Sequence, residues 1–428
     1  MNYSVLFNWM DRKLNLPKRI RNITIVYLLF LMIPTRKHTL QAAAKFFNLS
    51  KSSFSKLLNN HCDLAAAKLC ELSKRQAKQF GKNIDFIAAG NLPWKIAIII
   101  DATLQRRTSL NAQNVKKFNH GKGFVVGHQW TNIVLFVNDL LIPLTPIEFH
   151  TKAYCREHNL AYKTEHQKVV EYLTHLDLEQ YVGSHDPKQV IVLGDSGYDD
   201  KKIERTISGK GWTYIIALKK KRSVKTLKEY TDTPKSKGWH QIEQLFKNHR
   251  RNKWITVFLP KNSPQKKCME MRARQIEGYL RYVGRAQLIC SEMKKRRKQR
   301  RKHFACNDLK ATLRQILLAY RIRWQIELFH KTIKMYLGFE HVATTSFNSV
   351  VSHVYWVYCA YILLHSHPPG IPKKIKSVEE KQQEIMRSFK NRQISSMLQV
   401  MSRINGVDRL KNELRKAFEG PDVNQIFI

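Results

Sequence analysis

Acidic residues are scarce in this sequence. Asp and Glu together number 33 against 75 Lys and Arg, so the 428-residue chain carries a formal charge of +42. This excess goes far beyond what solubility needs, and it favours a polyanionic partner, with nucleic acid first and an anionic membrane surface second. Net charge alone does not separate these two partners.

Paired cysteines and phosphate-binding glycine motifs are absent. The seven cysteines are widely spaced and include no C-x-x-C pair, which argues against a zinc knuckle or ribbon and for a reducing compartment. We expect them to be packing residues, and we expect a cytoplasmic protein that is associated with the nucleoid if its partner is DNA. There is no G-x-x-x-x-G-K-[ST] stretch, so no ATP-driven step is predicted.

Long hydrophobic runs are missing as well. The run at residues 23–33 (ITIVYLLFLMI) is too short to span a bilayer, and residues 34–37 (PTRK) follow it in place of a small-residue cleavage site. The run at residues 350–364 contains four less apolar side chains, namely His353, Tyr355, Tyr358 and Cys359. Both runs are predicted to be buried helices, and no membrane association is expected.

The first ninety residues are predicted to be helical, with a helix-turn-helix pattern at residues 40–60 (LQAAAKFFNLSKSSFSKLLNN). The turn comes at residues 48–50, and Ser50 can cap a second helix that begins near Lys51. That helix would present polar side chains to the major groove of DNA, among them Lys51 and Lys56. An ordinary helical hairpin fits the same pattern.

From residue 91 the pattern changes to that of strands. Continuous apolar runs at 94–100 (WKIAIII) and 189–193 (QVIVL) predict two strands buried on both faces, which end at Asp101 and at Asp195. The other predicted elements are strands at 124–126, 132–137, 140–149 and 212–218, and helices at about 160–178 and 199–207. This order is that of an RNase H-like α/β layer, in which the first and fourth strands are neighbours.

The segment at residues 222–307 interrupts this layer. Very basic loops join strands predicted at 254–259, 278–283 and 287–290, which indicates an inserted β-rich subdomain. The loop at 294–303 (KKRRKQRRKH) is either a solvated linker or a phosphate-attracting site formed by Arg296, Arg297, Arg300 and Arg301. After it, Asp308 is predicted to cap a long helix.

These patterns predict an α/β protein with an RNase H-like core, a mixed sheet flanked by helices. Its length and its 43% hydrophobic residues suffice for two or three domains. Five parts are predicted. They are a helical N-terminal DNA-binding region (1–90), the first part of the core (91–221), the β-rich basic insertion (222–307), the second part of the core (308–370) and a helical C-terminal region (371–428).

Carboxylates at the ends of the two apolar strands indicate a metal site. Phosphodiester chemistry by metals needs hard oxygen ligands that converge from separate elements. Asp101 and Asp195 would be close in this strand order, and because two bare carboxylates repel, we expect a divalent cation between them.

Glu327 is the candidate third ligand. It lies on a predicted helix at 320–334 (YRIRWQIELFHKTIK), where one face also carries Tyr320, Arg323, Lys331 and Lys334. A solvated face with i,i+4 ion pairs is the other interpretation.

The same residues resemble a known signature. Four of them match, in identity and in all three spacings, the YREK signature of DDE transposases of the insertion-sequence-four group: Tyr320, Arg323, Glu327 and Lys334. The stretches IIIDAT (98–103) and VLGDSGYDD (192–200) are similar to the two Asp motifs of that group. The resemblance covers about residues 91 to 365.

This resemblance implies a transposase that acts on double-stranded DNA, both at the inverted-repeat ends of its element and at a target. Asp101, Asp195 and Glu327 would bind two Mg²⁺ ions, for which Mn²⁺ could substitute. The ions would activate water to cut one strand at each end and then activate the freed 3′-hydroxyl for strand transfer. The joining of two ends implies a homodimer, with the helical C-terminal region as its interface; a plain helical cap is the other interpretation of that region.

The resemblance also implies roles for neighbouring side chains. Phosphates near the cut would be held by Tyr320, Arg323 and Lys334, and Lys331 is a further candidate for DNA contact. Trp324 either stacks on a flipped base or packs, and His330 either contacts DNA or packs. Asp199 and Asp200 are expected to cap a helix, with a role as spare ligands as the alternative.

Two other functions remain open from sequence. The first is a domesticated DNA-binding protein that keeps the fold without catalysis, although all three acids are present. The second is a metal-dependent nuclease that cuts DNA and never joins strands.

Overall fold

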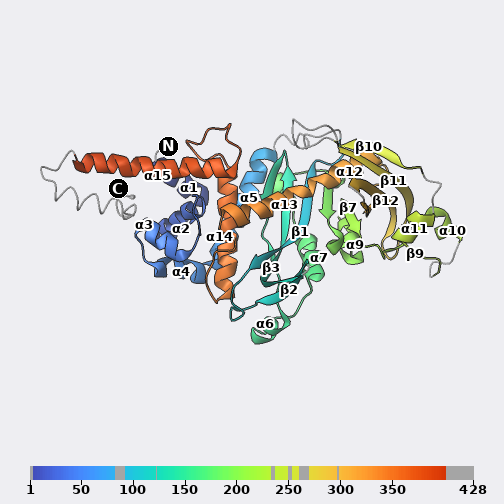
Figure 1. Ribbon diagram of the computed structural model, residues 1–428, viewed down its shortest axis with the longest axis horizontal. Helices are drawn as coiled ribbons and strands as arrows, with labels where there is room; N and C mark the ends of the chain where they lie inside the picture. The colour runs from blue at the N-terminus through green and yellow to red at the C-terminus, as the bar shows by residue number, and fades with distance from the viewer. Residues whose placement is uncertain are drawn as a thin grey trace.

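The structure is a computed structural model that describes residues 3–81, 92–121, 123–232, 237–248, 253–259, 269–295 and 298–401. The N-terminal helices lie at one end of an elongated molecule, a twisted sheet fills the middle, and the described part of residues 223–306 forms the other end (Figure 1). The predicted α/β class with a mixed sheet flanked by helices is confirmed.

The described residues of the N-terminal region form helices joined by short connections. Its helices are α1 (Tyr3–Leu14), α2 (Lys18–Leu31), α3 (Leu40–Phe47), α4 (Lys51–Asn60) and α5 (Cys62–Gly81). The side chain of Ser50 accepts from Ser52 N as the cap of α4, and Asn48 makes the turn in a left-handed conformation. The predicted helix pair and its cap are therefore confirmed. Lys51 and Lys56 are exposed on α4, and their contact with DNA stays a prediction.

The central strands have the predicted RNase H-like order. They are β1 (Ile96–Arg106), β2 (Lys116–His120), β3 (Gly123–Val137), β4 (Leu140–Pro143), β5 (Ile147–Glu148), β6 (Val190–Gly194) and β7 (Thr213–Leu218). β1 lies between β3, which is antiparallel to it, and β6, which is parallel, so the predicted pairing of the two apolar strands is confirmed. The strands predicted at 124–126 and 132–137 are one continuous strand, β3, because its whole length pairs with β1 and β2.

Helices connect and cover these strands. They are α6 (Lys152–Glu157), α7 (Glu165–His175), α8 (Glu179–Val182) and α9 (Lys201–Gly209), with short 3₁₀ turns η1 (Pro187–Gln189) and η2 (Ser196–Tyr198). The helix predicted at 160–178 is thus shorter, because Thr164 and Gln167 cap α7 at its N-terminus. Alternate residues of β1 face opposite cores. Ile96, Ile98 and Ile100 pack on the side of α7 and α9, whereas Ala97 and Ile99 pack with the N-terminal helices and α14.

The segment after β7 continues the same sheet. It contains β8 (Ser223–Thr226), α10 (Leu227–Asp232), β9 (His240–Gln241), α11 (Ile242–Asn248), β10 (Ile255–Leu259), β11 (Met269–Leu280), β12 (Gly284–Lys295) and β13 (Lys298–Cys306). β13 is antiparallel to β7, so the β-rich insertion and the core share one sheet. The strand predicted at 278–283 is instead the end of β11 and the turn after it.

The prediction of a loop at residues 294–303 is wrong. Its first two residues end β12 and the residues from Lys298 onward form β13, and the two strands pair as a hairpin. Arg301 pairs across the hairpin with Glu292, with 3.0 Å between Arg301 Nε and Glu292 Oε2, and this cross-strand ion pair helps to hold a very basic sequence in a strand. Arg300 lies in β13, whereas Arg296 and Arg297 lie outside the described residues.

Four helices complete the fold: α12 (Leu313–Ile322), α13 (Trp324–Tyr336), α14 (Phe347–His365) and α15 (Val378–Met401). Thr312 caps α12 through a capping box with Gln315, so the predicted cap at Asp308 is wrong. In the described part of the chain, α14 is the one helix whose length and composition would suit a membrane span. Since 94% of that window is buried inside the protein, α14 is a core helix, as predicted.

The cysteines behave mainly as packing residues. Four of them are free and buried, namely Cys155, Cys290, Cys306 and Cys359, while Cys62 and Cys70 are partly exposed and also free. Cys268 lies outside the described residues, as does the predicted helical segment beyond Met401.

Candidate active site

Two carboxylates lie on neighbouring central strands, where the pairing of β1 with β6 ends. β1 and β6 are parallel, and their last paired residues are Ile100 and Gly194, so Asp101 and Asp195 are the next residue on each strand. The prediction that β1 ends at Asp101 is wrong, because β1 continues to Arg106 along β3. Asp195 does follow its strand directly. It caps the turn η2, where its Oδ1 atom accepts from Gly197 N at 2.8 Å.

Arg323 links the third acid to Asp101. Its Nη1 atom lies 3.4 Å from Asp101 Oδ2, and its Nη2 atom forms an ion pair with Glu327 Oε1. The guanidinium is largely buried, with 13% of the side chain exposed. Asp101 on β1 therefore shares one cation with Glu327 on α13 and lies next to Asp195 across the β1–β6 pair.

The predicted continuous helix at 320–334 is wrong. Arg323 ends α12 and precedes α13, with backbone hydrogen bonds from Arg323 N to Tyr320 O and from Ile326 N to Arg323 O that span three residues instead of four. Tyr320 thus lies on a different helix from Glu327. It still borders the site, because the Arg323 guanidinium lies 5.8 Å from the centre of the Tyr320 ring.

A buried hydrogen-bond chain positions α13 against the sheet. Asn132 lies opposite Asp101 on β3, and its Nδ2 atom is 2.8 Å from His330 Nε2. The Tyr358 hydroxyl on α14 donates to Asn132 Oδ1. Burial lowers the pKa of His330 to about 3, so this ring is neutral and Nε2 can accept from the amide. His330 therefore packs, one of its two predicted roles.

The acids influence one another electrostatically. The pKa of Asp101 is raised to about 7, chiefly by burial; the charges of Asp195 and Glu327 act in the same direction, while Arg323 opposes them. Burial likewise raises the pKa of Tyr320 to about 12, with contributions from Asp195 and Asp101 in the same direction. The site thus concentrates negative charge, which Arg323 and the backbone amide of Ala102 partly offset at Asp101.

This arrangement predicts that Asp101 destabilises the fold as the pH rises. Its folded pKa of about 7 exceeds its ordinary value of 3.8, so the folded state binds the proton more tightly and stability falls between about pH 4 and pH 7. The wild type should lose unfolding free energy between pH 5 and pH 8. We expect this loss to be smaller in Asp101→Asn, by an amount on the order of a few kcal/mol. Urea unfolding of both proteins at the two pH values measures this, and equal differences would contradict it.

Three other predicted DNA-contacting residues lie on α13, the helix that carries Glu327. Trp324 is 52% exposed at the start of α13, and Lys331 is exposed on the same helix. Lys334 Nζ lies 3.8 Å from Glu340 Oε1. Of the two acids predicted as caps or spare ligands, Asp200 caps α9, while Asp199 pairs with Arg222 at 2.8 Å between Oδ1 and Nη1, so its predicted capping role is wrong.

The donor set suits a hard divalent cation. Asp101, Asp195 and Glu327 offer only carboxylate oxygens, the ligands that Mg²⁺ and Mn²⁺ prefer. Within the described ranges, no three or more His, Cys, Asp or Glu side chains are arranged so that they could already hold a metal ion. Arg323 supplies the compensating charge between Asp101 and Glu327 in this arrangement.

Some contacts of the site were not predicted from sequence. Asn132 has no motif around it, and its role depends on the register between β1 and β3. The pairing of Arg323 with Asp101 joins residues far apart in the chain. The turn at Gly197 and Tyr198 could have been noticed, because a Gly two residues after a strand-end Asp is typical of a tight turn.

Comparison with known proteins identifies the family. The family model for the transposase DDE domain matches residues 95–363, which span β1 to α14 and include all three acids. No curated protein gives a significant match. Because the matching family model covers more than half of the chain, the protein belongs to the DDE transposase family.

Proposed function

We propose that the protein is a cut-and-paste transposase of the insertion-sequence-four group, which cleaves the ends of its element and joins their 3′-hydroxyls to target DNA. One observation carries this proposal. Asp101 and Asp195 are adjacent on parallel strands, and Arg323 ties Asp101 to Glu327 within the YREK spacing.

The proposed chemistry assigns the three carboxylates to two Mg²⁺ ions, with Mn²⁺ as a substitute. When bound, the ions would lower the pKa of a water nucleophile and offset charge on the phosphate that is attacked. Arg323 would then exchange its carboxylate partners for a phosphate, since a guanidinium binds both in the same forked geometry. Tyr320 and Lys334 would hold neighbouring phosphates, and exposed Trp324 would stack on a base.

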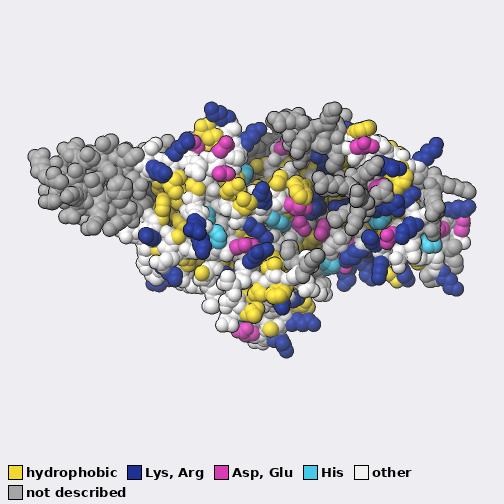
Figure 2. All heavy atoms as spheres, in the orientation of Figure 1, with side chains coloured by type: hydrophobic (Ala, Val, Ile, Leu, Met, Phe, Trp, Pro, Cys, Tyr) yellow, Lys and Arg dark blue, Asp and Glu magenta, His cyan; other side chains and the backbone are white. Residues whose placement is uncertain are grey.

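DNA would extend well beyond this centre. Lys and Arg side chains are spread over the described part of the visible face, where Asp and Glu side chains are fewer (Figure 2). We assign Lys51 and Lys56 to contact with the element ends, and we assign Lys331 and the basic hairpin that carries Arg300 and Arg301 to nearby phosphates. A homodimer would bring two ends together through the C-terminal region, and we place its action at the nucleoid in the cytoplasm.

A strand-transfer assay tests the proposal. The substrate is DNA that carries the inverted repeat found beside the gene, with supercoiled plasmid as the target and Mg²⁺ or Mn²⁺ as the metal. Joined products are the expected result. Cleavage without joining would show a nuclease, and binding without cleavage would show a domesticated DNA-binding protein.

Lys334 gives a prediction about the binding of end DNA. Lys334→Ala should weaken this binding and reduce the slope of log affinity against log salt by about one, because one phosphate contact is lost. Fluorescence anisotropy over a series of salt concentrations measures the slope. Lys163→Ala is the control, because Lys163 Nζ is paired with Glu171 at 2.7 Å on the exposed surface. If Lys334→Ala keeps the wild-type slope, Lys334 does not contact phosphate.

A further inference from the structure

The position of the Asp195 carboxylate depends on a very short loop. Asp195 is followed by the turn η2, and α9 begins only at Lys201. A side chain on Gly197 would place its Cβ 2.8 Å from Asp195 Oδ1, so the turn and the carboxylate are in close contact. Whatever holds this loop also sets the direction of the Asp195 side chain.

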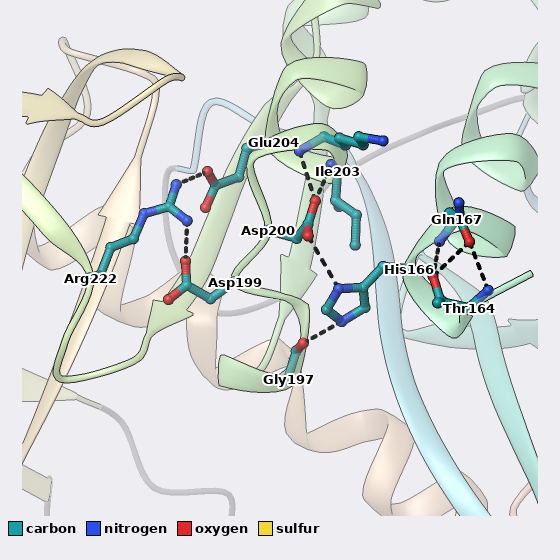
Figure 3. Close-up of polar contacts among 10 residues, drawn as sticks. Thr164, His166, Gln167, Gly197, Asp199, Asp200, Ile203, Glu204 and Arg222 are labelled. Carbon is teal, nitrogen blue, oxygen red and sulfur yellow. Dashed lines mark hydrogen bonds and ion pairs between the residues drawn. The ribbon is translucent and has the colours of Figure 1, made fainter.

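The first turn of α7 approaches this loop from the side. A capping box fixes that turn, since Thr164 N donates to Gln167 Oε1 at 2.8 Å and Gln167 N donates to Thr164 Oγ1 at 3.3 Å. In Figure 3, this cap lies beside His166, which points across to Gly197 and Asp200. The next two residues after the cap, Glu165 and His166, both contact the loop.

His166 holds both ends of the loop. Its Nε2 atom lies 2.8 Å from the Gly197 carbonyl oxygen, and its Nδ1 atom lies 3.2 Å from Asp200 Oδ2. Asp200 in turn caps α9 by accepting from Lys202 N at 2.7 Å. Because both partners of the ring are acceptors, a ring that serves both donates from both nitrogens. His166 therefore bridges the Asp195 turn and the start of α9.

Glu165 links the same loop to the strand beside Asp101. Its Oε1 atom accepts from the Tyr198 hydroxyl at 2.8 Å and from Thr131 Oγ1 at 2.6 Å, and its Oε2 atom accepts from Gln129 Nε2 at 2.7 Å. Thr131 and Gln129 lie on β3, where Thr131 is opposite Ala102, the residue after Asp101. The carboxylate of Glu165 thus connects the loop that carries Asp195 with the strand that pairs with Asp101.

We propose that Glu165 and His166 are positioning residues, which together fix the Asp195 carboxylate relative to Asp101. Neither side chain is part of the proposed metal-binding set, and each acts through Gly197 or Tyr198. This inference rests on the proposed function, because it assigns to the pair a role at the metal-binding acids. Outer contacts of this kind set the affinity of a carboxylate site for its metal.

The test is the affinity of the full-length protein for Mn²⁺, measured from the electron paramagnetic resonance signal of the free ion. We expect His166→Ala to weaken binding by about 10- to 100-fold. His166→Gln should recover part of the loss, because its amide can donate to one of the two acceptors. His175→Ala is the matched control. His175 lies at the other end of α7, where its Nδ1 atom contacts Glu171 O within the helix.

A second variant covers the case in which His166→Ala fails to fold. Tyr198→Phe removes only the hydroxyl that donates to Glu165, and it should also weaken Mn²⁺ binding while the circular dichroism spectrum is unchanged. Wild-type affinity in Tyr198→Phe and in a folded His166 variant would overturn the inference.

Asp195→Asn separates this failure from failure of the proposed function. If Asp195→Asn weakens Mn²⁺ binding while the positioning variants match His175→Ala, only the inference fails. If Asp195→Asn itself binds Mn²⁺ and cleaves end DNA as the wild type does, the proposed function fails and the inference fails with it.

Discussion

Asp101→Asn, Asp195→Asn and Glu327→Gln should each reduce cleavage of end DNA by at least about a thousandfold, as expected for groups that work as one unit. Each amide keeps the size of the side chain and loses the negative charge that a metal ligand needs. Binding of end DNA should persist, because the proposed phosphate contacts come from basic side chains and not from the acids. Binding can be stronger in these variants, since a repulsive carboxylate has been removed.

The measurement is a gel assay of end cleavage in Mg²⁺ and in Mn²⁺, with a binding assay on the same protein samples. Asp139→Asn and Glu157→Gln are the matched controls, because both acids are exposed and belong to none of the contacts described around the site. Double variants should be no slower than the slowest single variant if the acids act together. A single variant that cuts at the wild-type rate would remove its residue from the proposed site.

Arg222→Ala should cost about 3–5 kcal/mol of unfolding free energy, the usual loss when a buried ion pair keeps only one partner. Arg222 Nη1 lies 2.8 Å from Asp199 Oδ1, and its Nη2 atom pairs with Glu204 Oε2 (Figure 3). The two acid side chains are almost completely buried, with 2% and 0% exposed. Without the guanidinium, both buried carboxylates lose their ion-pair partner, although Asp199 keeps the hydrogen bond from Lys219 N at 2.8 Å and the nearby Lys219 charge.

The pH dependence of this loss provides an internal check. The pKa of Glu204 is raised to about 7, chiefly by burial; the charge of Asp199 acts in the same direction, while Arg222 opposes it. Protonation removes the unpaired charge, so the cost of Arg222→Ala should shrink as the pH falls from 8 to 5.

Chemical denaturation of both proteins at the two pH values measures this cost. The control is Arg285→Ala, which breaks an ion pair with Glu277 whose side chains are 47% and 39% exposed, and which should cost less than about 1 kcal/mol. Equal losses for the two arginines would contradict the prediction.

The elements predicted well from sequence are those whose local pattern matches their surroundings. The apolar run before Asp195 is buried on both faces, so its composition alone identified β6 and the acid that follows it. Ser50 caps α4 because capping is a local interaction of a side chain with the next turn. The pairing of the two apolar strands followed from the order of elements along the chain.

Other features depended on contacts between distant residues. β1 continues past Asp101 because β3 pairs with it there, although the polar residues after Asp101 no longer resemble a buried strand. The strand that begins at Lys298 was not predicted, because so basic a sequence is typical of a loop. Its pairing with β12 is what makes it a strand. The break at Arg323 could not be read from helical periodicity, because the periodic pattern continues through it.

The contacts of Glu165 and His166 illustrate the same limit. Both residues lie in the first turn of a helix, where polar side chains usually face solvent, and no sequence motif surrounds them. Their partners, Gly197 and Tyr198, belong to the Asp195 motif and lie more than thirty residues further along the chain. Only the fold reveals that α7 reaches the loop after β6.

The pairing of β13 with β7 has a mechanical consequence. β7 is also paired with β6, so a single strand separates the basic hairpin from the strand that leads to Asp195. Bent or twisted DNA on the hairpin would exert a force on it. This force would pass through two hydrogen-bonded strand pairs instead of being absorbed at a hinge. If DNA binds the hairpin as proposed, a force on the hairpin would therefore reach the strand that leads to Asp195 through continuous strand pairing.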